Sequence, residues 1–322
     1  MSSDKTYSLI IYMPALNEAA SILNVLKSLP KKIKGISTIQ YLVVDDGSTD
    51  NTAEIAKSFG ANVISHSYNR GVGKAFQTAV DFALKTQADI LVSIDADGQF
   101  DVNQITNMIN PIITNQADFC IGNRFYNKRP DKMPKVKYWG NKRVNSIVSL
   151  VGKTKIEDAS CGFRAYSKDC LLNLNLQGDF TYTHETILDL LNKGFNINQI
   201  PVKVKYFEDR VSRVANSLVQ YAVKTSLIIF KCLKDYRPLR FFLSIALFVL
   251  VLGLLLGGFV FIHWLNKGMI TPYKSIGFIA LALCGMSVFI ATLAFVADML
   301  NRIRDNQEKI LVLLKKDHFN SK

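Results

Sequence analysis

The sequence predicts an α/β domain with a mixed, mainly parallel sheet, followed by an interfacial helix and two transmembrane helices. In the N-terminal part, short apolar runs alternate with segments of helical spacing, which is the pattern of a mainly parallel sheet. In the C-terminal part, residues 241–262 and 275–297 form uncharged runs of 22 and 23 residues. Each run is longer than the ~20 residues that span a bilayer core.

The first predicted elements follow from the ends of the apolar runs. A run at residues 8–13 ends at Pro14 and predicts the first strand, because proline interrupts regular structure. Residues 17–29 have helical spacing and predict the first helix. A run at residues 39–44 is rich in β-forming residues and ends at an acidic turn, so it predicts the second strand.

The same alternation continues along the chain. Residues 49–59 and 71–85 have helical spacing, and the short runs at 62–65 and 90–94 predict strands between and after them. Residues 102–113 predict a further helix. This repeated order of strand and helix is what a parallel sheet with crossover helices requires.

Composition and charge exclude several classes of protein. The 322 residues are 49% hydrophobic with a net charge of +13, which excludes intrinsic disorder, a collagen-like fibre and a disulfide scaffold. Residues 1–120 carry −3, whereas 121–213 and 214–322 carry +8 each. A uniformly basic protein would suggest that it binds nucleic acid. Because only the second half of this chain is basic, we expect no nucleic acid as a partner, and we expect the second half to bind an anionic partner. Five cysteines lack metal-ligand spacing and are expected to be reduced and buried: Cys120, Cys161, Cys170, Cys232 and Cys284.

The two uncharged runs are expected to form a membrane hairpin with both ends on one side, because only residues 263–274 join them. Two buried helices of a soluble protein are the alternative, and they would require an unusually large core. Lys and Arg are frequent before the first run and after the second but sparse between them. By the positive-inside rule, the N-terminal domain and the C-terminus are expected on the cytoplasmic side of the cell membrane.

These patterns predict four parts of the chain. Residues 1–213 form the α/β domain, 214–238 an amphipathic helix on the membrane surface, 239–298 the hairpin and 299–322 a helical cytoplasmic tail. An ordinary surface helix of the soluble domain is the alternative for 214–238. The tail either packs on a partner subunit, in which case the protein is a homo-oligomer, or is solvated.

Three predicted strands lead directly into polar or acidic turns at residues 14–18, 45–50 and 95–99. Ligands bind at the carboxyl ends of the strands in such sheets, so these turns are expected along one rim. In the last turn, Asp95 and Asp97 stand two residues apart at the end of an apolar strand. Their carboxylates suit Mg²⁺ or Mn²⁺, with a diphosphate supplying further ligands. Taken alone this is a weak signal, since acidic turns after strands are common.

The order of the polar segments is more specific than any one of them. Residues 13–18, 43–50, 69–74 and 93–99 together resemble glycosyltransferase family 2, which has the Rossmann-like GT-A fold and uses nucleotide-sugar donors. Later segments resemble the polyprenyl- and dolichyl-phosphate glycosyltransferases of the dolichol-phosphate mannose synthase branch: residues 121–125, 158–164, 200–202 and 210–213. The resemblance covers roughly residues 7–213, and a two-helix C-terminal hairpin also occurs in that branch.

The resemblance implies a donor and metal site. Pro14, Glu18 and Asp46 are expected to line the nucleoside pocket. Asp95, Asp97 and Gln99 are expected to hold Mg²⁺ or Mn²⁺ and the donor diphosphate. The whole donor-binding set implied in this way is Pro14, Ala15, Glu18, Asp46, Lys74, Asp95, Ala96, Asp97, Arg210 and Arg213.

The implied catalytic residues are Asp158, Asp97 and Arg124. Asp158 most resembles the proposed base of the family, and Arg124, Arg210 and Arg213 resemble phosphate-binding cations near the membrane. Two departures from the family pattern matter. Leu16 stands where many relatives have Tyr, which puts base stacking there in doubt. Arg213 replaces the more common Lys, which keeps the charge but changes the donor geometry.

The resemblance implies inverting, metal-dependent transfer of a hexose from a UDP- or GDP-sugar to polyprenyl or dolichyl phosphate, giving a lipid-phosphate monosaccharide. By analogy with phosphoserine, whose second pKa is about 6, the acceptor phosphate is mostly dianionic near neutral pH. Asp158 therefore either removes a proton or positions a substrate. Eight Lys and Arg residues from Arg124 to Arg143 are interpreted as facing anionic lipids and the acceptor phosphate, and a solvated basic face is the alternative.

Two other functions stay open at this point. One is a membrane glycosyltransferase that extends a glycan on a saccharide hydroxyl, and the other is a non-enzymatic nucleotide-binding membrane protein. Processive synthases of the family carry a Q-x-x-R-W motif, and neither Trp139 nor Trp264 follows that pattern. The Asp95 and Asp97 pair argues against the non-enzymatic alternative.

Overall fold

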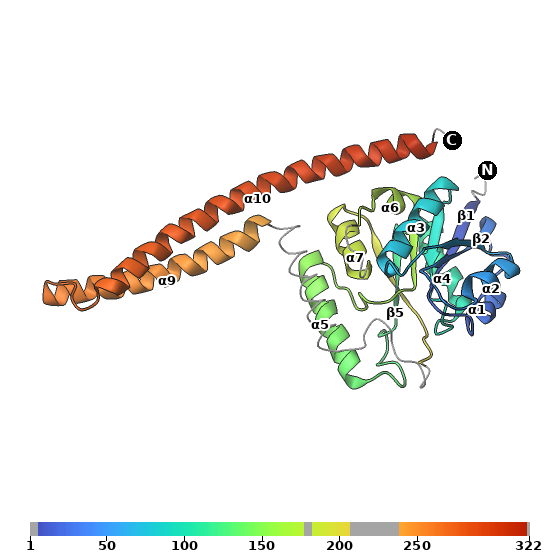
Figure 1. Cartoon of the computed structure of the whole chain (residues 1–322), viewed down its shortest axis with the longest axis horizontal. Coiled ribbons are helices and arrows are strands. Elements are labelled where there is room, and N and C mark those ends of the chain that lie inside the picture. The colour runs from blue at the N-terminus through green and yellow to red at the C-terminus, as the bar shows by residue number, and fades with distance from the viewer. Residues whose placement is uncertain (1–5, 177–181, 207–237, 321–322) are drawn as a thin grey trace. The chain divides into compact units, whose positions relative to one another are not determined.

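The computed structural model describes residues 6–176, 182–206 and 238–320. The chain divides into two compact units, one comprising Met1–Thr225 with Leu311–Lys322 and the other comprising Ser226–Ile310. The first unit contains an α/β domain with a seven-stranded sheet surrounded by helices (Figure 1). The amphipathic helix predicted at residues 214–238 lies outside the described residues except for Pro238. The predicted domain limits stay predictions.

The sheet has the strand order β3-β2-β1-β4-β6-β5-β7. Strands β3, β2, β1 and β4 are parallel to one another, β5 is parallel to β7, and β6 is antiparallel to both β4 and β5. This arrangement confirms the predicted mixed, mainly parallel sheet. The strands are β1 (Tyr7–Ala15), β2 (Ile36–Asp45), β3 (Asn62–Ser65), β4 (Ile90–Ser93), β5 (Phe119–Asn123), β6 (Arg164–Ser167) and β7 (Ile197–Pro201).

The centre of the sheet is the apolar core. Residues 9–13 of β1 and all of β4 are buried, as expected for parallel strands with both faces covered. Phe76 of α3 stacks on Tyr182 with 4.1 Å between ring centroids. The helices of this unit are α1 (Ile22–Ser28), α2 (Thr52–Phe59), α3 (Val72–Lys85), the 3₁₀ turn η1 (Val102–Gln104), α4 (Ile105–Ile113), α5 (Lys135–Gly152), α6 (Lys168–Asn173) and α7 (Thr183–Asn192).

The first predicted helix begins later than its spacing indicates. A helix was expected from residue 17, whereas α1 begins at Ile22. Asn17 has a φ of 52°, a left-handed conformation that cannot continue a helix. The backbone N–H groups of Glu18 and Ala19 donate to the side chains of Thr52 and Asp50. The residues before α1 are therefore held in a turn by the neighbouring loop.

Two helices among the described residues are long and apolar enough to cross a membrane. They are α9 (Pro238–Lys267) and α10 (Lys274–Asn320). The segment that joins them comprises residues 268–273 and is shorter than the predicted 263–274. Helix α9 extends into the predicted loop, so that Trp264 is helical. The described residues of the predicted tail, 299–320, are helical, and their helix continues the second apolar run without interruption. No proline or glycine stands between residues 286 and 320 to stop it.

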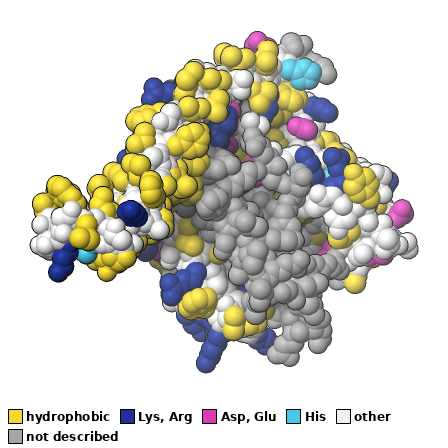
Figure 2. Space-filling model, turned by 60° about the vertical axis from the view of Figure 1, so that its left-hand side comes forward, with side chains coloured by type: hydrophobic (Ala, Val, Ile, Leu, Met, Phe, Trp, Pro, Cys, Tyr) yellow, Lys and Arg dark blue, Asp and Glu magenta, His cyan; other side chains and the backbone are white. Residues whose placement is uncertain are grey.

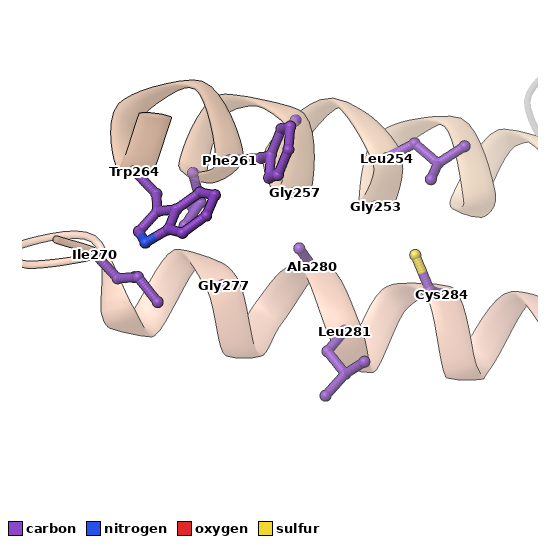
Figure 3. A pocket seen from close by; sticks show the side chains of 12 residues that line it. Gly253, Leu254, Gly257, Phe261, Trp264, Ile270, Gly277, Ala280, Leu281 and Cys284 are labelled. Atoms are coloured by element: carbon purple, nitrogen blue, oxygen red, sulfur yellow. The ribbon is translucent and has the colours of Figure 1, made fainter. Parts of the chain in front are cut away.

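Small residues bring α9 and α10 close together (Figure 3). A Cβ placed on Gly253 would lie 3.0 Å from the sulfur of Cys284 and 3.2 Å from the carbonyl oxygen of Ala280. Ser287 donates a hydrogen bond of 2.9 Å to the carbonyl oxygen of Ala246. Towards Trp264 the two helices leave a hollow of about 490 Å³ with an apolar lining.

Candidate active site

The turns that follow β1, β2 and β4 lie at one edge of the sheet. Ala15 pairs with Asp45 at the ends of β1 and β2, and Tyr12 pairs with Ser93 of β4. The N–H of Asp46 donates to the carbonyl oxygen of Ala15 at 2.8 Å. Because adjacent parallel strands end at the same edge, the three polar turns predicted to share a rim do share it.

Hydrogen bonds join the first two turns to one another. The N–H of Asn17 donates to Oγ of Ser48 at 2.9 Å, and the N–H of Thr49 donates to Oδ1 of Asn17 at 2.7 Å. Glu18 is half-buried, and its carboxylate accepts a hydrogen bond of 2.8 Å from Ser21. Of the other residues expected in this pocket, Pro14 is half-buried and Ala15 is buried at the end of β1.

Asp46 is a buried carboxylate with three donors among the described residues. Oδ1 accepts from the N–H of Arg70 at 2.9 Å and lies 2.7 Å from Nδ1 of His66. Oδ2 accepts from the N–H of Gly71 at 2.8 Å. The predicted nucleoside residue therefore also fixes the segment that leads into α3.

Asp95 and Asp97 are both half-buried at the end of β4. Oδ1 of Asp97 accepts from the N–H of Gln99 at 3.0 Å. A Cβ placed on Gly162 would lie 3.0 Å and 3.2 Å from the two carboxylate oxygens of Asp95, so the absence of a side chain there leaves room beside that carboxylate. Ala96 between them is buried.

The donor set of this turn fits a hard divalent cation held jointly with a ligand. Among the described residues, no group of three or more His, Cys, Asp or Glu side chains converges as a complete metal site. Mg²⁺ in phosphate-handling sites takes one or two carboxylates and completes its shell with phosphate oxygens and water. Asp95 and Asp97 with the space at Gly162 meet that requirement, and a ligand role for the Gln99 side chain stays a prediction.

Lys74 lies in the first turn of α3. Its amine donates to Oε1 of Gln77 at 3.0 Å, and Nε2 of Gln77 donates to the carbonyl oxygen of Leu176 at 3.1 Å. Its predicted contact with the donor stays a prediction. Arg210 and Arg213 lie outside the described residues.

Arg124 and Asp158 form a buried ion pair beside the acidic turn. Nε of Arg124 lies 2.7 Å from Oδ2 of Asp158, Nη2 lies 2.8 Å from Oδ1, and the Arg124 N–H donates to Oδ2 at 3.1 Å. The two side chains are 11% and 0% exposed. Burial disfavours the charge of Arg124, but the adjacent Asp158 carboxylate outweighs burial and raises the pKa of Arg124 well above its ordinary value.

Helix α5 holds the loop that carries Asp158. Asn145 accepts a hydrogen bond of 2.9 Å from the N–H of Ala159 and donates to the carbonyl oxygen of Glu157. Ser160 donates to Oδ1 of Asn141 at 2.8 Å. These contacts flank Asp158 on both sides, so α5 fixes the position of the ion pair.

Lys137 and Tyr206 add a cation and a phenol to the same place. Nζ of Lys137 lies 5.5 Å from the centre of the Tyr206 ring, and Nη1 of Arg124 donates to the Tyr206 hydroxyl at 3.3 Å. Burial, followed by repulsion from Arg124, lowers the pKa of Lys137, while Asp97 opposes that shift. Lys137 is therefore within electrostatic range of both Arg124 and Asp97.

Beneath the ion pair lies a second buried cation, Arg164. It is 0% exposed and donates to the carbonyl oxygens of Ala159, Cys161 and Thr183 at 2.7–2.8 Å. Arg164 thus ties the Asp158 loop to the start of α7. Cys161 is a buried thiol whose pKa is raised to about 12, mainly by burial, so it is not a nucleophile near neutral pH.

The outer face of α5 combines apolar and basic side chains. Val136, Trp139 and Leu150 are 57%, 60% and 75% exposed, and the guanidinium of Arg143 lies 4.9 Å from the centre of the Trp139 ring. Figure 2 shows Lys and Arg side chains next to exposed apolar ones on one face of the molecule. A mixture of this kind suits an anionic lipid surface.

Sequence reasoning missed several residues of this site. Asn141, Ser160 and Tyr206 carry no charge pattern, and Lys137 was one of eight basic residues with nothing in its spacing to separate it from the others. His66 gave no signal because its partners, Asp46 and Thr78, are distant in sequence. All of these residues belong to the site through contacts between elements that are distant in sequence.

Comparison with known proteins agrees with this arrangement. The sequence profile described as "Glycosyl transferase family 2" matches residues 10–174. An uncharacterized protein of Methanocaldococcus jannaschii is 34% identical over 227 residues, which cover 69% of this chain and 92% of that protein. A UDP-N-acetylglucosamine–dolichyl-phosphate N-acetylglucosaminyltransferase of Methanococcus voltae is 31% identical over 250 residues, covering 71% of this chain and 97% of the relative.

Among solved structures, glucosyl-3-phosphoglycerate synthase from Mycobacterium tuberculosis in complex with UDP shares the fold. Its TM-score is 0.56 at 21% identity, covering 70% of this chain and 80% of that one. A complex of the same protein with Mn²⁺, UDP-glucose and phosphoglyceric acid has a TM-score of 0.52 at 20% identity, with the same two coverages. At this identity the likeness supports the GT-A-like fold alone.

Proposed function

We propose that this chain, which belongs to glycosyl transferase family 2, transfers a hexose from a UDP- or GDP-sugar to polyprenyl or dolichyl phosphate. The chain is a glycosyltransferase related to dolichyl-phosphate sugar transferases. The choice of a lipid phosphate as acceptor rests chiefly on one observation. The half-buried side chains of Arg124 and Lys137 both contact Tyr206, and the loop of Asp158, which pairs with Arg124, lies against Asp95 at Gly162.

The two cations favour a phosphate over a hydroxyl as the attacking group. A sugar hydroxyl carries no charge for Arg124 and Lys137 to bind, whereas a lipid monophosphate carries nearly two near neutral pH. Each phosphate oxygen accepts charge-assisted hydrogen bonds of the kind that guanidinium and ammonium groups donate. Tyr206, bound to Arg124 and stacked beside Lys137, keeps both cations close to one point.

The donor side is carried by the rim of the sheet. Asp95 and Asp97 would hold Mg²⁺ or Mn²⁺, which when bound offsets the negative charge that develops on the departing nucleoside diphosphate. Asp46 and the segment ending at Gly71 form the wall nearest the nucleoside. In this proposal, negative side chains surround the donor and positive side chains surround the acceptor. The opposite net charges of the two halves of the sequence agree with that arrangement.

In the proposed reaction an oxygen of the lipid phosphate attacks the anomeric carbon, and the bond from that carbon to the diphosphate breaks. A single displacement of this kind inverts the anomeric centre. The attacking oxygen is already ionised, so no side chain has to remove a proton. Asp158 accordingly acts by positioning Arg124, because its carboxylate is occupied by the guanidinium.

The membrane supplies the acceptor in this proposal. Helices α9 and α10 are apolar enough to anchor the chain, and the outer face of α5 would rest on anionic head groups near the point where a lipid phosphate enters. The frequency of Lys and Arg outside the hairpin supports a cytoplasmic α/β domain and C-terminus.

The proposal is tested with the full-length protein in detergent or nanodiscs. Radiolabelled UDP- and GDP-sugars are offered with undecaprenyl phosphate, with dolichyl phosphate and with the corresponding lipid alcohols as matched controls. We expect label in the lipid fraction only with a phosphorylated lipid, and its loss on addition of EDTA. Transfer to a lipid alcohol or a saccharide hydroxyl, but never to a lipid phosphate, would overturn the proposal.

A further inference from the structure

His66 lies directly after β3, with its ring buried between the donor rim and α3. Nδ1 is 2.7 Å from Oδ1 of Asp46, and Nε2 is 3.0 Å from Oγ1 of Thr78. The side chains of His66 and Asp46 are 6% and 8% exposed. A carboxylate only accepts hydrogen bonds, so Nδ1 is the protonated nitrogen, and in the neutral ring Nε2 accepts from the Thr78 hydroxyl.

The backbone from His66 to Gly71 is shaped by the turn after β2. The N–H of His66 donates to the carbonyl oxygen of Asp45 at 2.8 Å. A Cβ on Gly47 would lie 2.6 Å from the carbonyl carbon of Tyr68, so the two backbones touch. The Asp46 carboxylate accepts hydrogen bonds from the backbone N–H groups of Arg70 and Gly71, further along the same segment. The orientation of one carboxylate therefore sets the course of this segment.

We propose that His66 is a positioning residue for the nucleotide donor, acting through Asp46. It holds the Asp46 carboxylate against the backbone of Arg70 and Gly71, and Thr78 holds the ring in turn. Without His66, the carboxylate loses its only side-chain donor among the described residues and is held by the backbone N–H groups of Arg70 and Gly71 alone. This inference rests on the proposed function, since it assumes that a nucleoside diphosphate binds at this rim.

His66→Asn and His66→Gln are expected to differ in their effects, because each keeps a different one of the two contacts of the ring. The amide nitrogen of asparagine can occupy the place of Nδ1, so His66→Asn keeps a donor for Asp46 and loses the contact with Thr78. The longer glutamine reaches the place of Nε2, so His66→Gln keeps the Thr78 contact and loses Asp46. His66→Ala removes both contacts. Ser67→Ala, at the adjacent exposed position, is the matched control.

The experiment measures binding of UDP and of GDP to each full-length variant by calorimetry with Mg²⁺ or Mn²⁺ present, and the KM for lipid phosphate. A hydrogen bond to a charged group accounts for roughly a tenfold or larger change in affinity. We expect His66→Ala and His66→Gln to bind the nucleotide at least about tenfold more weakly. His66→Asn and Ser67→Ala are expected to stay close to the unmodified protein, with the KM for lipid phosphate unchanged throughout.

Hydrogen exchange supplies a reading that does not depend on binding. In His66→Ala, the amides in the peptide covering residues 69–73 should exchange faster while the central strands keep their protection. Unchanged exchange there, nucleotide affinity equal to that of the unmodified protein, or an asparagine variant as weak as the glutamine variant would each overturn the inference. If the unmodified protein binds neither UDP nor GDP, the proposed function fails and the inference fails with it, whereas failure of the variants alone leaves the proposed function standing.

Discussion

The guanidinium of Arg124 meets the Asp158 carboxylate at two points, with Nε 2.7 Å from Oδ2 and Nη2 2.8 Å from Oδ1. Ser160 contacts both partners, since it accepts from Nη2 of Arg124 at 3.0 Å and lies 3.4 Å from Oδ1 of Asp158. Both oxygens of the Asp158 carboxylate are therefore bonded to Arg124, and neither points to an open position where it could take a proton from a substrate. This geometry favours a positioning role for Asp158 over the role of a base.

Replacing Asp158 tests that role. Asp158→Asn leaves a buried guanidinium without its counter-charge, which is expected to lower the free energy of unfolding by about 3–5 kcal/mol. Turnover should fall, yet kcat/KM should still rise with pH through about 6, where the acceptor phosphate loses its second proton. The measurement is the pH profile of both proteins with saturating donor. Loss of the rise in the Asn variant alone would identify Asp158 as the base.

Asp97 is expected to be indispensable for the metal-dependent step. Asp97→Asn removes one of two carboxylates available to the cation, so transfer should fall at least about a hundredfold, with partial recovery at high Mn²⁺. Asp101→Asn, at an exposed carboxylate that caps η1, is the control and should retain most activity. Equal activity of Asp97→Asn and the unmodified protein at limiting metal would contradict the assignment.

Lys137 predicts an alkaline limit to acceptor binding. Because burial and Arg124 lower its pKa, Lys137 loses its charge at a lower pH than an exposed lysine does. A dianionic phosphate favours the protonated amine, so the KM for the acceptor should rise as the pH passes the lowered pKa. Lys137→Met should show a high KM at every pH, and Lys137→Arg should move the rise upward. Lys142→Met, exposed on the same helix, should behave like the unmodified protein.

His184 predicts a loss of stability in acid. Burial and the nearby Arg164 lower the pKa of His184 from its ordinary value of 6.5 to about 4. Between pH 6.5 and pH 4, the unfolded chain therefore binds a proton at His184 while the folded chain does not. The free energy of unfolding should therefore fall by about 3 kcal/mol as the pH drops from 6.5 to 4. Neither ring nitrogen has a hydrogen-bond partner among the described residues.

His184→Leu should remove this dependence on pH without a large loss of stability at pH 7, as measured by thermal or denaturant unfolding. If the stability of the variant falls in acid as much as that of the unmodified protein, His184 is not the source of the acid sensitivity.

The proposed orientation in the membrane is tested by labelling. In a version with Cys232→Ser and Cys284→Ser, Lys267→Cys at the turn of the hairpin should react with a membrane-impermeant maleimide in intact cells. Lys316→Cys in the tail should react only after permeabilisation. The remaining thiols are buried with raised pKa values and should stay silent. The opposite pattern would place the α/β domain outside.

The rim of the sheet could be predicted from sequence because each piece of it is local. The strand that ends at Asp45 and the strand that ends just before Asp95 are each followed directly by their acidic turn, and parallel neighbours bring such turns together. The start of α1 could not be predicted, since the residues before it are held by Ser48, Asp50 and Thr52 from another loop.

The acceptor side depends on long-range contacts and was harder to predict. Asn141 and Asn145 look like ordinary polar residues of a basic helix, and only their hydrogen bonds to Ser160 and Ala159 reveal that they support the ion pair. The continuity of α10 was also hidden, because the change from apolar to charged residues suggests two elements where the backbone forms one helix.

The central claim is that the sugar becomes bonded to a phosphate, and nuclear magnetic resonance of the product tests it most directly. A donor labelled with ¹³C at the anomeric carbon is converted with undecaprenyl or dolichyl phosphate, and the lipid product is purified. We predict coupling between that carbon and phosphorus, with an anomeric configuration opposite to that of the donor. An anomeric carbon without phosphorus coupling, bonded instead to a hydroxyl oxygen of the acceptor, would contradict the account.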